Sequence, residues 1–210
     1  MNKWWETNGE NMVPDVSDVS GRKRYWMKRE TEKMVIFLDE KPSFFYFEHQ
    51  VKIGNNFRNY ATCLRMLKEP CKLCSIGERR YEAAAFTVLD CTEWTDKEKK
   101  VHSFTKRLYI AKRAAWEKIE RQYRHLAKKD LSLRGALFAI ARGAGDKSPT
   151  VGDDFNYEEH VELSELTGVN VDVFDYGDML KPDVGIVNSF AEQLALFSDE
   201  PTVKKANFDV

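Results

Sequence analysis

The sequence predicts a mainly β (α+β) fold, an OB-fold-like barrel of five to six strands with an inserted helix. Three observations support this prediction. Short runs of strand-forming residues recur through the first 160 residues, turn-length segments separate them, and one long amphipathic helix interrupts the series. Antiparallel strands with short connections are typical of small barrels rather than of parallel sheets.

The first predicted strands lie before the cysteine residues. Residues 33–38 (KMVIFL) form an apolar run, and residues 44–51 (FFYFEHQV) are rich in strand formers. A Gly-Asn-Asn turn at 54–56 leads into residues 57–61, which predicts a hairpin. A short helical stretch is expected at residues 78–82.

Further strands are expected at residues 85–90, 136–141 and 155–161, each a short run of apolar or strand-forming residues. Residues 101–110 alternate as a half-buried strand does. That alternation places on one face His102, Phe104, Lys106, Leu108 and Ile110.

The clearest predicted helix covers residues 111–129. Its apolar stripe consists of Ala115, Ile119, Tyr123 and Leu126. A second, short amphipathic helix is expected at 189–197. We expect a flexible N-terminal arm at 1–20, a core at 21–161 and an acidic C-terminal region at 162–210.

Charge is segregated along the chain, although the net charge is only -1. Residues 21–145 carry 28 Lys and Arg against 15 Asp and Glu, a net charge of +13. Residues 146–210 carry 4 against 15, a net charge of -11. A basic body followed by an acidic region indicates nucleic-acid binding rather than two ordinary solvated faces, on which the signs are normally mixed.

The ends and the hydropathy of the chain predict a soluble, cytoplasmic protein. Residues 1–10 lack the cationic start and apolar run of a signal peptide. No segment approaches the roughly 20 apolar residues of a membrane span.

Four residues have the spacing of a metal site. The pattern H-x13-C-x7-C-x2-C consists of His49, Cys63, Cys71 and Cys74. A CxxC knuckle brings two thiolates to one ion, and zinc takes four such nitrogen and sulfur ligands in its structural sites. The pattern predicts one structural Zn²⁺ in a small subdomain at about residues 49–84. A redox CxxC pair is the alternative, and His102 is the alternative fourth ligand.

These stretches resemble a known family. The ligand pattern, the segments 21–39, 44–51 and 56–80, and the run ALFAIARGAGD at 136–146 are similar to the zinc-containing single-stranded-DNA-binding proteins of bacteriophages. The prototype of that family is the helix-destabilising protein of phage T4. The resemblance implies an OB-fold core, a structural zinc, no catalysis, and roles in DNA replication, recombination and repair.

The resemblance also implies partners. It suggests that the acidic C-terminal region contacts replication and recombination proteins, and that copies self-associate on DNA. One departure is the N-terminal arm, which lacks the strongly basic character linked to cooperative self-association in the prototype.

A protein that binds single strands with little sequence preference needs cations for phosphates and aromatic rings for bases. Charge beside an aromatic ring marks the best candidates. About half of the aromatic rings are expected to touch nucleic acid, because an aromatic residue on a strand is more often part of the core. The candidates are Arg22, Lys23, Arg24, Tyr25, Trp26, Lys28, Tyr46, Arg58, Tyr60, Arg79, Arg80, Lys106, Arg107 and Tyr109.

Two other functions were weighed. A zinc-dependent, sequence-specific DNA-binding regulator would need a recognition helix beside the knuckle. An enzyme would need catalytic motifs, and the sequence contains no phosphate-binding GxxxxGK[ST] loop, no GxSxG and no HExxH. We therefore expect a protein that is not an enzyme.

Overall fold

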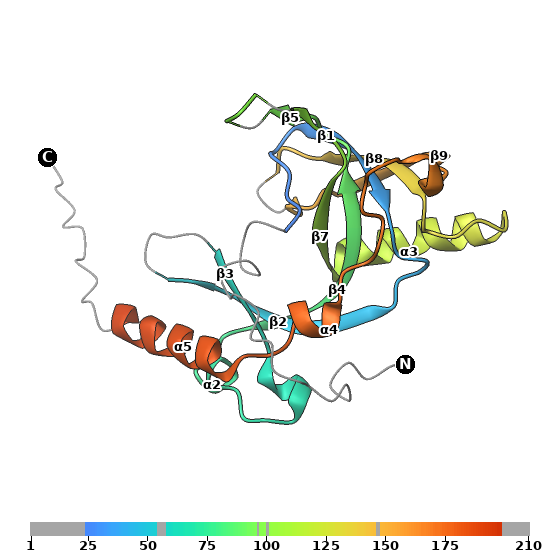
Figure 1. Ribbon diagram of the computed structural model, residues 1–210. Helices are drawn as coiled ribbons and strands as arrows, with labels where there is room; N and C mark the ends of the chain where they lie inside the picture. The colour runs from blue at the N-terminus through green and yellow to red at the C-terminus, as the bar shows by residue number, and fades with distance from the viewer. Residues whose placement is uncertain (1–23, 54–57, 96, 100, 146–147, 199–210) are drawn as a thin grey trace, which may run out of the picture. The chain divides into compact units, whose positions relative to one another are not determined.

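The structure is a computed structural model that describes residues 24–53, 58–95, 97–99, 101–145 and 148–198 (Figure 1). The expected arm at 1–20 lies outside these residues. The chain divides into two compact units. One contains residues up to Phe47 and Tyr81–Lys181, and the other contains Glu48–Arg80 and the residues from Pro182 onward.

The first unit is built on an antiparallel sheet. Strand β1 (Thr31–Phe37) pairs with β4 (Arg80–Asp90) on one side and with β8 (Ala136–Arg142) on the other. Strand β7 (Thr105–Lys112) adds to β4, and β9 (Asp154–His160) adds to β8. The order of these strands is therefore β7-β4-β1-β8-β9, and β2 (Phe44–Lys52) is a further neighbour of β4 in the same sheet. This confirms a mainly β fold with antiparallel pairing.

Both faces of β1 are covered, which explains its run of apolar residues without alternation. Val35 and Phe37 face the main core, which includes Phe86 and Tyr109. Ile36, on the opposite face, belongs with Leu38 and Leu89 to a second cluster. The apolar residues packed against this second cluster come partly from the C-terminal region, namely Leu163, Leu166, Val169 and Val171.

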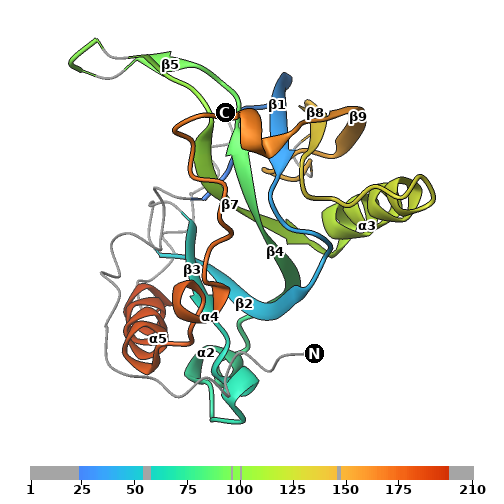
Figure 2. The same ribbon diagram turned by 45° about the vertical axis from the view of Figure 1, so that its right-hand side comes forward.

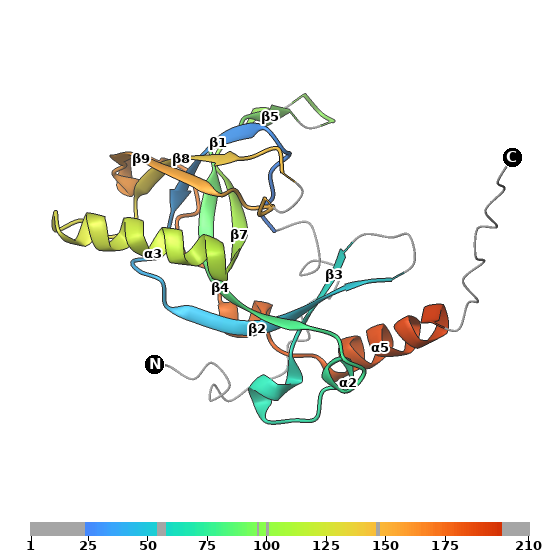
Figure 3. The same cartoon turned by 180° about the vertical axis from the view of Figure 1, so that it is seen from behind.

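The expected closed barrel is not found. No pairing joins β7 to β9 in the described part of the chain. Helix α3 (Arg113–Ala127) contacts both strands and lies beside β9 (Figure 3). Gln122 Nε2 donates to the Phe155 carbonyl at 2.9 Å, and Lys118 Nζ donates to the Asp153 carbonyl. Side chains of the helix thus satisfy carbonyl groups that a closing strand would otherwise pair with.

The single strand expected at 101–110 is divided in two. Phe104 has a φ of 54°, a left-handed conformation that interrupts the alternation. Val101–His102 forms β6, which pairs with β5 (Trp94–Thr95) in a two-stranded ribbon. This β5–β6 ribbon extends from the ends of β4 and β7 (Figure 2).

The second unit begins with the predicted hairpin. Strand β2 (Phe44–Lys52) starts in the first unit, and its later residues pair with β3 (Arg58–Thr62). The short helices η2 (Leu64–Leu67) and α2 (Lys72–Ser75) follow. The helix expected at 78–82 is wrong, because Gly77 adopts a φ of 87° and β4 begins at Arg80.

The described part of the C-terminal region contains three further elements. Helices η3 (Leu163–Glu165) and α4 (Tyr176–Met179) belong to the first unit. Helix α5 (Val184–Ser198) starts earlier than the predicted segment 189–197 and packs against α2 and β3 of the second unit. None of the described helices has the length and apolar character needed to cross a membrane.

Candidate functional site

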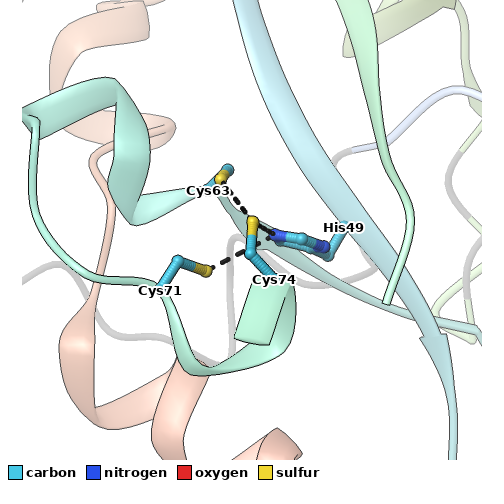
Figure 4. Close-up of side chains that lie close together, drawn as sticks. All are labelled: His49, Cys63, Cys71 and Cys74. Atoms are coloured by element: carbon cyan, nitrogen blue, oxygen red, sulfur yellow. Dashed lines mark hydrogen bonds between the residues drawn. The ribbon is translucent and has the colours of Figure 1, made fainter. Parts of the chain in front are cut away.

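The four residues with metal-site spacing meet in the second unit (Figure 4). His49 lies on β2, and Cys63 directly follows β3. Cys71 is the N-cap residue of α2, and Cys74 lies within that helix. His49 Nε2 lies 3.5 Å from the Sγ atoms of both Cys71 and Cys74, and the Sγ atoms of Cys63 and Cys74 are 3.6 Å apart. All four ligand atoms lie within 4.8 Å of one another.

These separations suit one tetrahedral ion. Zinc–sulfur and zinc–nitrogen bonds of about 2.3 and 2.1 Å place the ligand atoms of a tetrahedron roughly 3.5–3.8 Å apart. The three measured separations lie within or close to that range. The residues present therefore fit a bound metal ion, and the predicted ligand set is brought together, with His49 as the fourth ligand.

Local structure positions the cysteines. The side chains of Leu64 and Leu73 are buried, and they anchor the two short helices that hold the thiols. The Glu78 amide donates to the Leu73 carbonyl at 2.9 Å, and Gly77 supplies the left-handed residue of this turn. The knuckle is thus fixed by backbone geometry as well as by its ligands.

The donor atoms of the cluster are the nitrogen and sulfur types that zinc binds, and their pKa values are shifted by the surroundings. Burial lowers the pKa of the His49 imidazole and keeps the ring neutral, the form that binds metals. Burial alone would raise the pKa of the Cys71 thiol, but hydrogen bonds from the backbone of Cys74 and Leu64 and from neighbouring thiols outweigh it and lower that pKa. Burial and the adjacent Cys63 raise the pKa of Cys74 to about 12.

One thiol thus ionises more readily than its neighbour, and several thiolates this close would repel one another without a cation between them. The positively charged Arg80 side chain is also close to the cluster, since its Nη1 atom lies 4.0 Å from Cys63 Sγ. Such outer contacts orient metal ligands and adjust their basicity. A filled four-ligand shell leaves no open position for a substrate.

Sequence comparison identifies no relatives. The chain matches no known protein-family model, and no curated protein is similar to it.

A second candidate site lies in the first unit, beside the start of β1 and the end of β4. This cationic cleft has a volume of about 620 Å³. Its lining consists of Arg24, Tyr25, Trp26, Lys28, Thr31, Lys33, Asp90 and Arg107. Four of these residues are cationic and one is acidic. The acid, Asp90, is paired with Lys33 at 2.8 Å.

The segment before β1 alternates in exposure. Arg24, Trp26 and Lys28 lie partly or fully at the surface, whereas Tyr25 and Met27 are buried. The Trp26 side chain is 57% exposed. Five predicted residues are thus brought to one cleft, and Trp26 is the ring among them with an accessible face.

Three predicted aromatic platforms are corrected by their burial. Tyr25, Tyr46 and Tyr109 are all buried in the first unit, so their faces are not available to a base. Tyr25 stacks on Tyr109 with ring centroids 5.2 Å apart. The Tyr109 hydroxyl donates to the Val151 carbonyl at 2.7 Å, and burial raises its pKa well above the usual value. These rings serve the core.

Lys106 contacts the acidic C-terminal region. Its Nζ atom donates to Asn170 Oδ1 at 3.0 Å and to the Asp172 carbonyl at 3.1 Å, and it lies 4.8 Å from the centre of the Phe174 ring. This predicted DNA-binding cation is thus already engaged by residues 170–174.

The remaining predicted residues do not line the cleft. Arg79 and Arg80 are exposed in the second unit, and Tyr60 is half-buried on β3. Arg22, Lys23 and the side chain of Arg58 lie outside the described residues.

Sequence reasoning missed Lys33, which lines the cleft although it begins the apolar run 33–38. It also missed Trp94, an exposed ring on β5 that does not line the cleft. The signal for Lys33 was its place at the start of β1, two residues after Thr31, which puts both side chains on one face. For Trp94 the signal was its position next to a charged turn, where a core tryptophan is unusual.

Proposed function

We propose that this chain binds single-stranded DNA with little sequence preference, and that it coats and protects unpaired strands during DNA replication, recombination and repair. The observation that carries the proposal is the cationic cleft with Trp26 exposed beside it. No nuclease or transferase chemistry is part of this proposal.

The cleft has the two components that such binding needs. Arg24, Lys28 and Arg107 supply positive charge for the phosphates. The exposed Trp26 ring supplies a stacking surface, and every base has a face to stack on it, which makes the contact tolerant of sequence. Arg107 lies on β7, and the other groups lie in the segment that precedes β1. The proposal treats this antiparallel sheet as the counterpart of an OB-fold binding face.

The proposal assigns the metal centre a structural role. His49, Cys63, Cys71 and Cys74 would hold one Zn²⁺, which would tie the β2–β3 hairpin to the α2 knuckle. Zinc bound by a complete set of protein ligands supplies folding free energy rather than chemistry.

A sequence-specific regulator is the weaker proposal. Helix α2 contains four residues, Lys72–Ser75, and β4 follows shortly after it. A recognition helix must present several side chains along a major groove, for which one turn is too short.

The proposed partners are single-stranded DNA and other replication or recombination proteins. The protein partners would contact the acidic residues of the C-terminal region, several of which are exposed, including Asp172, Asp175 and Asp178. The same proposal includes self-association of the protein on DNA. The protein would act in the cytoplasm of a bacterial cell.

The proposal is tested by titrating labelled, unstructured oligonucleotides and the matching duplex with the full chain and following anisotropy. Tighter binding to the single strand is expected, and Trp26→Ala should weaken it by about ten-fold or more, the loss of one stacked base. Equal or tighter binding to the duplex would overturn the proposal.

A further inference from the structure

We propose that the β5–β6 ribbon carries a second stacking platform for the unpaired strand, formed by Trp94 and His102. This inference rests on the proposed function and extends its interface beyond the cationic cleft. The ligand is the same chemical class, a flexible single strand whose bases are free to stack.

The platform is preformed. The rings of Trp94 and His102 stack with centroids 4.4 Å apart and planes 17° apart. Trp94 Nε1 donates to Thr105 Oγ1 at 2.8 Å, which fixes the orientation of the indole against β7. The Trp94 side chain nevertheless remains 45% exposed, which is unusual for so large an apolar group.

Strand geometry places this platform next to the cleft. Thr105 and Arg107 are two residues apart on β7, so their side chains share one face, roughly 7 Å apart along the strand. Arg107 lines the cleft, and Thr105 is the direct cross-strand partner of Asp90, another cleft residue. A DNA strand bound at Arg107 would therefore reach the Trp94 indole, which is hydrogen-bonded to Thr105, by extending along β7.

The ribbon itself is not basic. Among its described residues, Lys97 and Lys99 are offset by Glu93 and Glu98. A phosphate grip is therefore not its contribution. Stacking requires no net charge and no base identity, which matches an exposed indole supported from behind by an imidazole.

Phosphate contacts in the cleft and base stacking on Trp94 should affect the salt dependence of binding differently. Phosphate contacts release counterions, so losing one changes the slope of log K against log salt concentration. A stacking platform contributes affinity without changing that slope. Its contribution should also require a strand long enough to extend past the cleft.

The test uses the full chain with deoxythymidine oligonucleotides of about 4 and 12 nucleotides, near the limits of single-strand site sizes. Trp94→Ala should weaken binding of the longer strand by about 10- to 100-fold, with an unchanged salt slope and little effect on the shorter strand. Trp94→Phe should retain most of the affinity, because a ring face remains. Thr105→Val removes the hydrogen bond without removing the indole and should cost less than Trp94→Ala.

Two results would overturn the inference. The first is that Trp94→Ala binds the longer oligonucleotide as tightly as wild type does, while Trp26→Ala binds it more weakly. That result would leave the proposed function intact. The other is a loss that is equal for both strand lengths, or that Trp94→Phe does not rescue, since either indicates a structural role for the ring. A wild-type chain without preference for single strands would remove the proposed function as well.

Discussion

Asp39 offers a quantitative test of how the C-terminal region is held on the first unit. Its carboxylate is buried and accepts hydrogen bonds from the Thr87 amide at 2.6 Å and from the Tyr176 hydroxyl at 2.7 Å. Thr87 Oγ1 in turn lies 2.9 Å from the Tyr176 hydroxyl oxygen and accepts from the Phe174 amide at 2.8 Å. Residues 174–176 are thus joined to the sheet by one buried polar network.

Burial raises the pKa of Asp39 to about 6, even though these hydrogen bonds and Arg134 oppose the shift. An unfolded Asp has a pKa of about 3.9, so the difference is about two units, or roughly 3 kcal/mol. Between pH 4 and 6 the folded chain binds more protons at this site than the unfolded chain. The free energy of unfolding therefore falls as pH rises through that window.

Asp39→Asn removes this titration but keeps a side chain that fits the network, with Oδ1 accepting from Thr87 and Nδ2 donating to the Tyr176 oxygen. The variant should gain about 2 kcal/mol of stability relative to wild type between pH 4 and 7, because the unfolded Asp is already partly ionised at pH 4, whatever its constant offset at pH 4. Urea denaturation followed by tryptophan fluorescence at a series of pH values measures this difference.

Glu40→Gln is the matched control, because its neighbouring carboxylate is exposed. It removes a carboxylate next to Asp39 in the sequence but leaves the buried network intact, so its urea denaturation provides the baseline for Asp39→Asn. Metal loss at low pH affects all three proteins alike and cancels in the comparison. A stability difference between Asp39→Asn and wild type that stays constant from pH 4 to 7 would refute the reasoning.

Three further predictions concern the metal, the core and the acidic region. Wild-type protein purified without chelator should contain one zinc per chain by metal analysis, and less than one would contradict the proposed zinc site. Cys74→Ser should lose the zinc, and the second unit should then unfold. Gly152→Ala should lower the free energy of unfolding by about 2 kcal/mol or more in urea melts. Gly152 has a φ of 92°, and the added Cβ would lie 2.3 Å from Ile140 Cγ2. Gly145→Ala is the control and should be nearly neutral, because no atom lies within 4 Å of its added Cβ. Asp172 and Asp178 are exposed acids of the C-terminal region, and their negative charge should compete with the phosphates for the cations of the first unit. Neutralising both should tighten binding to single strands about two-fold at low salt and not at high salt. An equal effect at both salt concentrations would argue against this competition.

That last variant replaces a simple truncation. Removing the residues after about 165 would take away the same acidic side chains. The structure shows that Leu166, Val169 and Val171 pack on the second cluster of the sheet, and that Tyr176 is buried. A truncated chain would lose these contacts, so altered binding could not be separated from altered folding.

The metal centre was predictable because its geometry is local. A CxxC knuckle places two thiols together by itself. The hairpin register pairs His49 with Ala61, two residues before Cys63, so the histidine and the third cysteine meet at one end of the hairpin. Turn residues at 54–56 were enough to indicate that pairing.

The cleft was predictable only in part, because adjacency in sequence does not specify a face. Tyr25 and Trp26 are neighbours and both lie beside cations, yet extended backbone sends one ring into the core and the other to the surface. Barrel closure was not predictable either, since it depends on long-range contacts such as that of Gln122 with Phe155. The alternation of residues 101–110 predicted one strand, but Phe104 adopts a left-handed conformation that divides it.

The central claim is that the cleft holds the phosphates of an unpaired strand. Its most direct test is the salt dependence of oligonucleotide binding by Lys28→Ala/Arg107→Ala, compared with Lys128→Ala/Lys129→Ala beyond the end of α3. Losing two phosphate contacts should reduce the magnitude of the slope of log K against log salt by about 1.4, while the control pair keeps the wild-type slope. Equal slopes for the wild type and the cleft variant would contradict the claim.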